Sequence, residues 1–123
     1  KEEQDTYAQF LVKKDVQFIE KIHQVIEENL DNSDFNIDTI ASTIGLSRSA
    51  FFKKLKSLTG FAPVDLVKEI RLNKSIELIK NSDMSISEIA FAVGFKDSGY
   101  FSKCFRKKYD QTPREYMNEW RKG

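Results

Sequence analysis

An internal repeat constrains the fold of this 123-residue chain more than any other feature of its sequence. The pattern Ile-x-x-Ile-Ala-x-x-Ile/Val-Gly occurs at residues 37–45 and again at 86–94, an offset of 49. After one extra residue in the second copy, residues 51–63 align with 101–113 at an offset of 50. Self-similarity at a fixed spacing indicates a repeated structural unit, and two copies are too few for a solenoid. The repeat therefore predicts a duplicated functional unit.

Apolar residues recur with helical spacing along the whole chain, and no stretch alternates in the manner of a half-buried strand. An N-cap at Asp15 and the apolar stripe that follows it predict a first helix over about 15–31. Glycines, prolines and further capping residues mark the ends of six more helices. These helices are expected at about 37–44, 48–59, 63–81, 86–93, 98–109 and 113–120.

Each copy of the repeat combines a short helix, a turn that contains glycine, and a longer helix. Ala41 and Ala90 are small enough for two helices to approach closely, and Gly45 and Gly94 permit a sharp turn. This is the pattern of a helix-turn-helix. We therefore predict an all-α fold of about seven helices, in which a long linker helix joins two helix-turn-helix subdomains.

Charge is concentrated in blocks, although the net charge of the chain is only +1. Residues 47–60 and residues 96–109 each carry a net charge of +4, whereas residues 1–36 carry −5. Two basic blocks at equivalent points of a repeat predict two surfaces that face nucleic-acid phosphates.

In each unit, we expect the second helix to dock by an apolar face and to present its opposite face to a major groove of double-stranded DNA. The docking residues are expected to be Phe51, Leu55 and Leu58 in the first copy and Phe101 and Phe105 in the second. The outward residues are expected to be Arg48, Ser49, Phe52, Lys53 and Lys56 in the first copy and Ser98, Gly99, Ser102, Lys103 and Arg106 in the second.

The domain organisation follows from these elements. Residues 1–14 are assigned to a linker or N-terminal extension and residues 15–123 to one DNA-binding domain. Within it we expect a first unit over about 15–62, a linker helix over about 63–81 and a second unit over about 82–123. The linker helix would span about 27 Å, and successive major-groove faces recur about every 34 Å. One chain would thus set two recognition helices into adjacent grooves.

Several short runs carry a resemblance to a known family. They are Ile40-Ala41, Gly45-Leu46-Ser47, residues 54–60, Arg71-Leu72, residues 86–95, residues 98–105 and residues 112–116. Through them the segment from Asn36 to Trp120, about two-thirds of the chain, resembles the C-terminal DNA-binding domain of AraC/XylS-type transcription regulators. The run from Asp15 to Ser33 looks like the entry helix of hybrid two-component regulators, which fuse a sensor histidine kinase, a receiver and this type of domain.

The resemblance implies a transcription regulator, usually an activator, that binds double-stranded DNA and contacts RNA polymerase. By family position, base contacts would fall on Ser49, Phe52 and Lys53 in the first unit and on Ser98, Gly99, Ser102 and Lys103 in the second. Phosphate contacts would fall on Arg48, Lys56 and Arg106.

Two of these positions depart from hydrogen-bonding readout. Phe52 offers only contact with a thymine methyl or a sugar, and Gly99 has no side chain. The second unit would then position the domain more than it specifies a sequence.

Other functional classes lack the residues that they need. No nucleophile–base pair, glycine-rich phosphate loop or metal-ligating cluster occurs, so we predict no enzyme, no cofactor and no metal site. Cys104 has no second cysteine for an internal disulfide. No apolar run approaches the ~20 residues of a membrane span, and we expect a cytoplasmic protein without membrane contact in this segment.

Two alternatives to a sequence-specific regulator stay open at this point: a nonspecific architectural DNA binder and a helical protein-interaction module. A homodimer through upstream regions is a further expectation, with Tyr7, Phe10, Leu11 and Val12 as its candidate contacts. Arg71, in the linker helix, is interpreted as a structural bridge between the two lobes rather than as a DNA contact.

Overall fold

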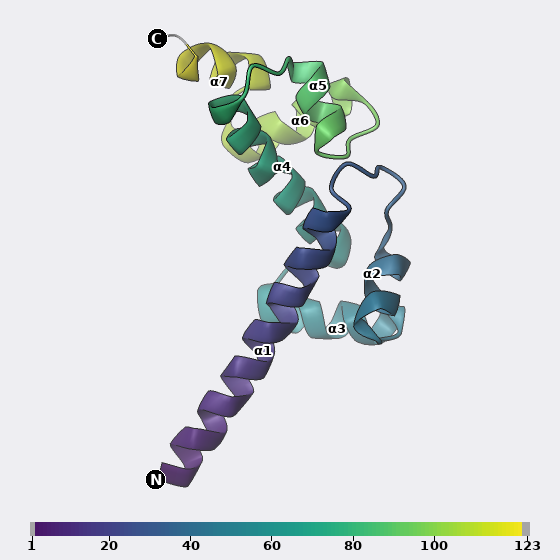
Figure 1. Ribbon diagram of the computed structural model, residues 1–123, viewed down its shortest axis with the longest axis vertical. Coiled ribbons are helices and arrows are strands. Elements are labelled where there is room, and N and C mark those ends of the chain that lie inside the picture. Colours follow the sequence, from purple (N-terminus) through teal and green to yellow (C-terminus); the bar gives the residue numbers. More distant parts are fainter. Residues whose placement is uncertain (1, 122–123) are drawn as a thin grey trace. The chain divides into compact units, whose positions relative to one another are not determined.

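The computed structural model describes residues 2–121, and every regular element in that range is an α-helix (Figure 1). The prediction of an all-α fold with seven helices is confirmed. The helices are α1 (Glu2–Glu28), α2 (Ile37–Ile44), α3 (Arg48–Thr59), α4 (Pro63–Asn81), α5 (Ile86–Ala92), α6 (Ser98–Tyr109) and α7 (Pro113–Trp120). Among the described residues, no helix has both the length and the apolar composition to cross a membrane.

The chain forms two compact units, and α4 passes as one continuous helix from the first into the second. The first unit holds the chain up to Glu28 together with Asn36–Leu66. The second holds Asn29–Phe35 and the chain from Val67 onward. The short connection 29–35, which the sequence analysis placed with the first unit, thus packs within the second.

The first unit is built on the C-terminal half of α1, against which α2 and α3 pack (Figure 1). Phe51 of α3 is fully buried and lies edge-on to Phe18 of α1, with ring centroids 6.5 Å apart. Ile22 and Ile40 are also fully buried. The expected N-cap of α2 is present: the side chain of Asn36 accepts a hydrogen bond from the backbone N–H of Thr39 at the start of this helix.

The predicted start of α1 at Asp15 is wrong, because the helix begins at Glu2 and runs without interruption to Glu28. Residues 2–14 contain neither Gly nor Pro, and most of them have high helix propensity. Asp15 therefore lies inside a helix rather than at its cap. Phe10 and Val12 are exposed on this part of α1. The side chain of Tyr7 lies outside the described part of the chain. The assignment of residues 1–14 to a linker or N-terminal extension stays a prediction.

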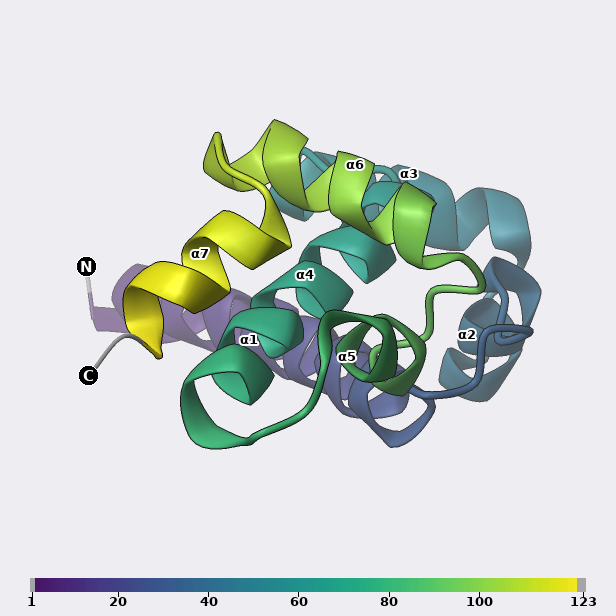
Figure 2. The same cartoon turned by 90° about the horizontal axis from the view of Figure 1, so that it is seen from above.

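In the second unit, α5, α6 and α7 pack around the C-terminal part of α4 (Figure 2). Its core is a succession of aromatic rings, in which Phe101 lies 5.2 Å from Phe95 and 5.8 Å from Phe105, centroid to centroid. Tyr109 continues the series 4.6 Å from Phe105 and donates a hydrogen bond to Asn73 of α4. Burial, with a smaller contribution from Tyr116, raises the pKa of Tyr109 to about 12.

Arg71 of α4 ties the connection 29–35 to the turn after α5. Its guanidinium donates hydrogen bonds to the carbonyl oxygens of Asn32 (3.2 Å) and Gly94 (3.0 Å). Burial lowers the pKa of Arg71, and its buried Nε has no hydrogen-bond partner among the described residues. Arg71 thus makes structural contacts, but its interpretation as a bridge between the two lobes is wrong, because both of its partners belong to the second unit, as Arg71 itself does.

The glycines that end the first helix of each repeat have the same backbone conformation but different surroundings. Gly45 has φ +85° and Gly94 has φ +94°, both left-handed. A Cβ added at Gly45 would meet nothing within 4 Å, whereas one at Gly94 would overlap the Leu30 carbonyl oxygen and lie 2.8 Å from Cζ of Arg71. Gly94 is therefore required for close packing as well as for the turn.

We predict that Gly94→Ala destabilises the protein more than Gly45→Ala does. The change at Gly45 should cost about 1–2 kcal/mol for the left-handed backbone alone. The change at Gly94 adds overlap with backbone and should cost at least about 3 kcal/mol in total. Urea unfolding followed by circular dichroism measures both, and equal losses would contradict this account.

Candidate nucleic-acid interface

The second helix of each repeat, α3 or α6, is fixed at its N-terminus by a cap and along one side by buried aromatic and aliphatic groups. The side chain of Ser47 accepts a hydrogen bond from the N–H of Ala50, and that of Asp97 accepts one from the N–H of Gly99. Phe51 and Leu55 of α3 are fully buried, as are Phe101 and Phe105 of α6. The predicted docking residues are confirmed at these four positions. Leu58 is 38% exposed and does not belong to the buried set.

The outward face of α3 contains all five residues that the sequence analysis assigned to it. They are Arg48, Ser49, Phe52, Lys53 and Lys56, and each is exposed. An α-helix turns by about 100° per residue, so positions 48, 49, 52, 53 and 56 fall on one side of it. Arg48 lies at the edge of this side nearest α2, where its Nη1 donates to the carboxylate of Asp38 at 3.2 Å.

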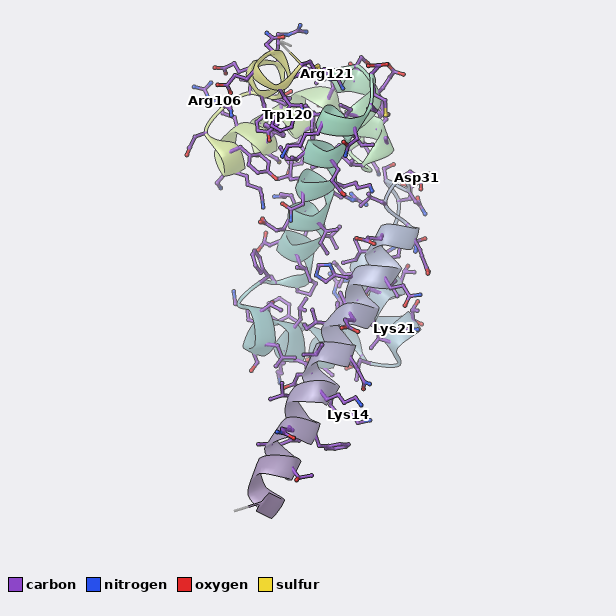
Figure 3. All side chains as sticks on the ribbon, turned by 60° about the vertical axis from the view of Figure 1, so that its left-hand side comes forward. Lys14, Lys21, Asp31, Arg106, Trp120 and Arg121 are labelled. Atoms are coloured by element: carbon purple, nitrogen blue, oxygen red, sulfur yellow. The ribbon has the colours of Figure 1, made fainter. Side chains whose placement is uncertain are left out.

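The outward face of α6 has the same five positions at an offset of 50. Gly99, Lys103 and Arg106 are exposed, whereas Ser98 and Ser102 are half-buried. Figure 3 shows Arg106 at the outer edge of the second unit, with its side chain directed away from the ribbon. Arg106 also contributes to lowering the pKa of Glu115, an effect that arises chiefly from hydrogen bonds between Glu115 and Thr112 in the capping box of α7.

Three lysines of the two basic blocks lie off the outward faces: Lys54 and Lys108 are held by partners, and Lys96 precedes α6 and forms an exposed ion pair. Lys54 lies over the ring of Phe18, with its Nζ 4.3 Å from the centroid. Lys96 pairs with Asp34 at 3.1 Å. Lys108 forms an ion pair with Glu69 of α4, and partial burial lowers the pKa of Lys108.

These pairings were missed by sequence reasoning because each partner is distant in the chain. The net charge of each basic block was calculated as if every lysine in it faced outward. The positive charge left on the outward faces is accordingly smaller than the block counts suggested. In the second unit it comes mainly from Lys103, Arg106 and the neighbouring exposed Lys107, which was not among the predicted site residues. Its place within the basic block 96–109 was the signal that could have identified it.

The two faces offer ammonium, guanidinium and hydroxyl donors on the outer sides of docked helices, which suits phosphates and base edges. Among the described residues, no group of three His, Cys, Asp or Glu side chains could hold a metal ion. Cys104 is buried on the inner side of α6. The arrangement provides donors for recognition of a polyanion, and its candidate residues include no nucleophile paired with a base.

Two basic helices, each docked behind a short helix and a tight turn, define a tandem helix-turn-helix domain. The family described as "Helix-turn-helix domain" matches residues 40–119. The chain belongs to this family, the AraC-type DNA-binding domains of transcription regulators. It is thus a DNA-binding domain of a transcription factor and not an enzyme.

Similar proteins include multidomain regulators and isolated domains. A "Histidine kinase P4" of Formosa agariphila is 38% identical over 106 residues, which are 86% of this chain but 8% of that protein. The C-terminal domain of the two-component response regulator yesN from Fusobacterium nucleatum superposes with a TM-score of 0.75 at 30% identity, covering 82% of this chain and 98% of that one. The DNA-binding domain of AdpA, solved in complex with a target DNA, has a TM-score of 0.77 at 28% identity, covering 85% and 92%.

The two ion pairs beside the outward faces should differ in their effect on stability. The Lys108–Glu69 side chains are 20% and 34% exposed, whereas those of Arg48–Asp38 are 69% and 66% exposed. We predict that Glu69→Gln costs about 1–2 kcal/mol because it leaves Lys108 partly desolvated without a counter-charge. Asp38→Asn serves as the control and should cost no more than about 0.5 kcal/mol. Chemical denaturation tests this order, and a larger loss in the control would contradict it.

Proposed function

We propose that this domain is a sequence-specific regulator that places α3 and α6 into successive major grooves of one DNA site. The observation that carries the proposal is the equivalence of the two outward faces. Five positions of α3 recur in α6 at a constant offset, on the side opposite fully buried Phe51 and Phe101. A docked helix with a polar, basic outer side is the geometry that helix-turn-helix proteins use to enter a groove.

The continuity of α4 supports the use of two adjacent grooves. Its 19 residues, Pro63–Asn81, correspond to a length of about 28 Å. Successive major-groove faces on one side of B-DNA lie about 34 Å apart. The length of α4 is comparable to this spacing, as a connection between two recognition helices requires. A single chain would then recognise an asymmetric site or a direct repeat without a twofold axis.

The proposed contacts divide by chemistry. Ser49, Phe52 and Lys53 of α3 would face bases, as would Ser98, Gly99, Ser102 and Lys103 of α6. Arg48, Lys56 and Arg106 would face phosphates. The exposed Arg48–Asp38 pair is compatible with this role, because an exposed ion pair contributes little and a phosphate can replace the carboxylate.

The chain spans 8% of the length of the histidine kinase that it matches, and the activity of a whole protein is accordingly a proposal. We infer that the domain is the DNA-binding output of a two-component regulator that activates transcription through contact with RNA polymerase. The likeness to a response-regulator C-terminal domain and the family resemblance support this role. A homodimer through upstream regions would use exposed Phe10, Leu11 and Val12.

Selection of preferred sequences from a random duplex pool tests the function directly. We expect a bipartite motif whose two halves are centred about one helical turn, or about 10 base pairs, apart. Binding to all duplexes alike would favour an architectural DNA binder. Failure to bind any duplex, together with capture of a protein partner, would favour a protein-interaction module.

Loss of an outward lysine should weaken binding, and loss of a lysine that faces a phosphate should also reduce the salt dependence. We predict that Lys53→Ala and Lys103→Ala each cost about 1–3 kcal/mol of binding free energy when the lysine contacts DNA. Lys53 and Lys103 are assigned to bases, so the salt dependence is tested with Lys56→Ala, whose lost phosphate contact should make the slope of log K against log[salt] less negative by about one. Fluorescence anisotropy at several salt concentrations provides both quantities.

Lys54→Ala is the matched control for this experiment, because Lys54 lies on the same helix but stacks on Phe18. It should leave the salt slope unchanged. Unaltered affinity in the Lys53→Ala/Lys103→Ala double variant would reject the assigned recognition faces.

A further inference from the structure

Phe52 exposes an aromatic ring on the outward face of α3. The side chain is 47% exposed, whereas Phe51, the next residue, is fully buried. Among the described residues, no other ring and no cation stacks on the ring of Phe52. The lysine two residues further along the helix, Lys54, stacks instead on Phe18. The ring therefore takes no part in the core of the unit.

The surroundings of Phe52 on the helix argue against an apolar docking patch. Its exposed neighbours one turn away or adjacent in sequence are Arg48, Ser49, Lys53 and Lys56. A single ring among basic and hydroxyl groups suits a partner that is mostly anionic and offers one small apolar feature. Double-stranded DNA has this character in its major groove, where the thymine 5-methyl group lies among hydrogen-bonding base edges and phosphates.

We propose that Phe52 selects thymine in the part of the DNA site bound by the first unit, through contact between its ring and the 5-methyl group. This inference rests on the proposed function and specifies the base that one residue reads. Phenylalanine has no hydrogen-bonding group, so it cannot distinguish bases by donors and acceptors. Thymine is the only standard base that presents a methyl group in the major groove.

The second unit lacks this form of selectivity. At the position equivalent to Phe52 it has Ser102, which is half-buried, and Gly99 stands at the position equivalent to Ser49. No apolar side chain occupies its five outward positions. A preference that depends on the methyl group should therefore be confined to one half of the site.

The test replaces each thymine of the selected duplex, one at a time, by deoxyuridine, which removes only the methyl group. For the wild-type domain we expect about fourfold weaker binding at each thymine that Phe52 contacts. Phe52→Ser, which introduces the residue found at the equivalent position of the second unit, should bind thymine and uracil duplexes equally. Phe52→Leu should retain the discrimination because it retains an apolar side chain.

Leu58→Ser provides the matched control, because Leu58 is also exposed on α3 but lies about 120° around the helix from Phe52. It should keep the discrimination between thymine and uracil. In a double-mutant cycle, the loss of the methyl group and Phe52→Ser should be non-additive. Circular dichroism of each variant checks that it is folded.

The outcomes separate this inference from the proposed function. A preferred duplex that binds equally well with uracil at every thymine would overturn thymine selection but leave sequence-specific binding intact. The same holds if Phe52→Ser keeps the full discrimination or if the selected site has no thymine at a position sensitive to Phe52. A domain with no preferred duplex would overturn both proposals.

Discussion

The packing of Arg71 against Gly94 is the constraint on which the second unit depends. One guanidinium donates to carbonyl oxygens of two segments that are far apart in sequence, the connection 29–35 and the turn after α5. The arrangement requires a residue without a Cβ at position 94, because the Leu30 carbonyl and Arg71 itself occupy that space. Since the turn leads directly into α6, this interaction helps to position that helix, together with fully buried Phe101 and Phe105.

The equivalent turn in the first unit is less constrained by its surroundings. Gly45 adopts the same left-handed conformation with open space around it, and α3 is held instead by Phe51 against Phe18 and by Leu55. In both units the helix that carries the outward face is anchored by fully buried side chains on its opposite side. The two copies thus share the requirement for a docked helix, while the contacts that meet it differ.

Whether a feature could be predicted from the sequence depended on how far apart in the chain its interacting residues lie. Helix ends and caps such as Asn36 were predictable, because the capping residue lies within three positions of the backbone group that it bonds. The outward positions on α3 and α6 followed from helical periodicity. The start of α1 was not predictable from the apolar stripe, because this part of the helix has no buried stripe: the side chains described there, at residue 6 and residues 8–14, are all exposed. The pairings of Lys54 and Lys108 depend on tertiary contacts, which no local pattern in the sequence contains.

The separation of anchoring and outward side chains on α3 and α6 has a consequence for how such a regulator can diverge. Substitutions at exposed positions away from caps and cores usually change stability by no more than about 0.5 kcal/mol. Positions such as Phe52 and Lys103 can therefore be exchanged one at a time without endangering the fold. In the proposed binding mode, duplication of the unit doubles this freedom, since one half of the DNA site could change while the other half still holds the protein on the DNA. New regulatory targets would then be acquired in small steps, each of which leaves a folded protein.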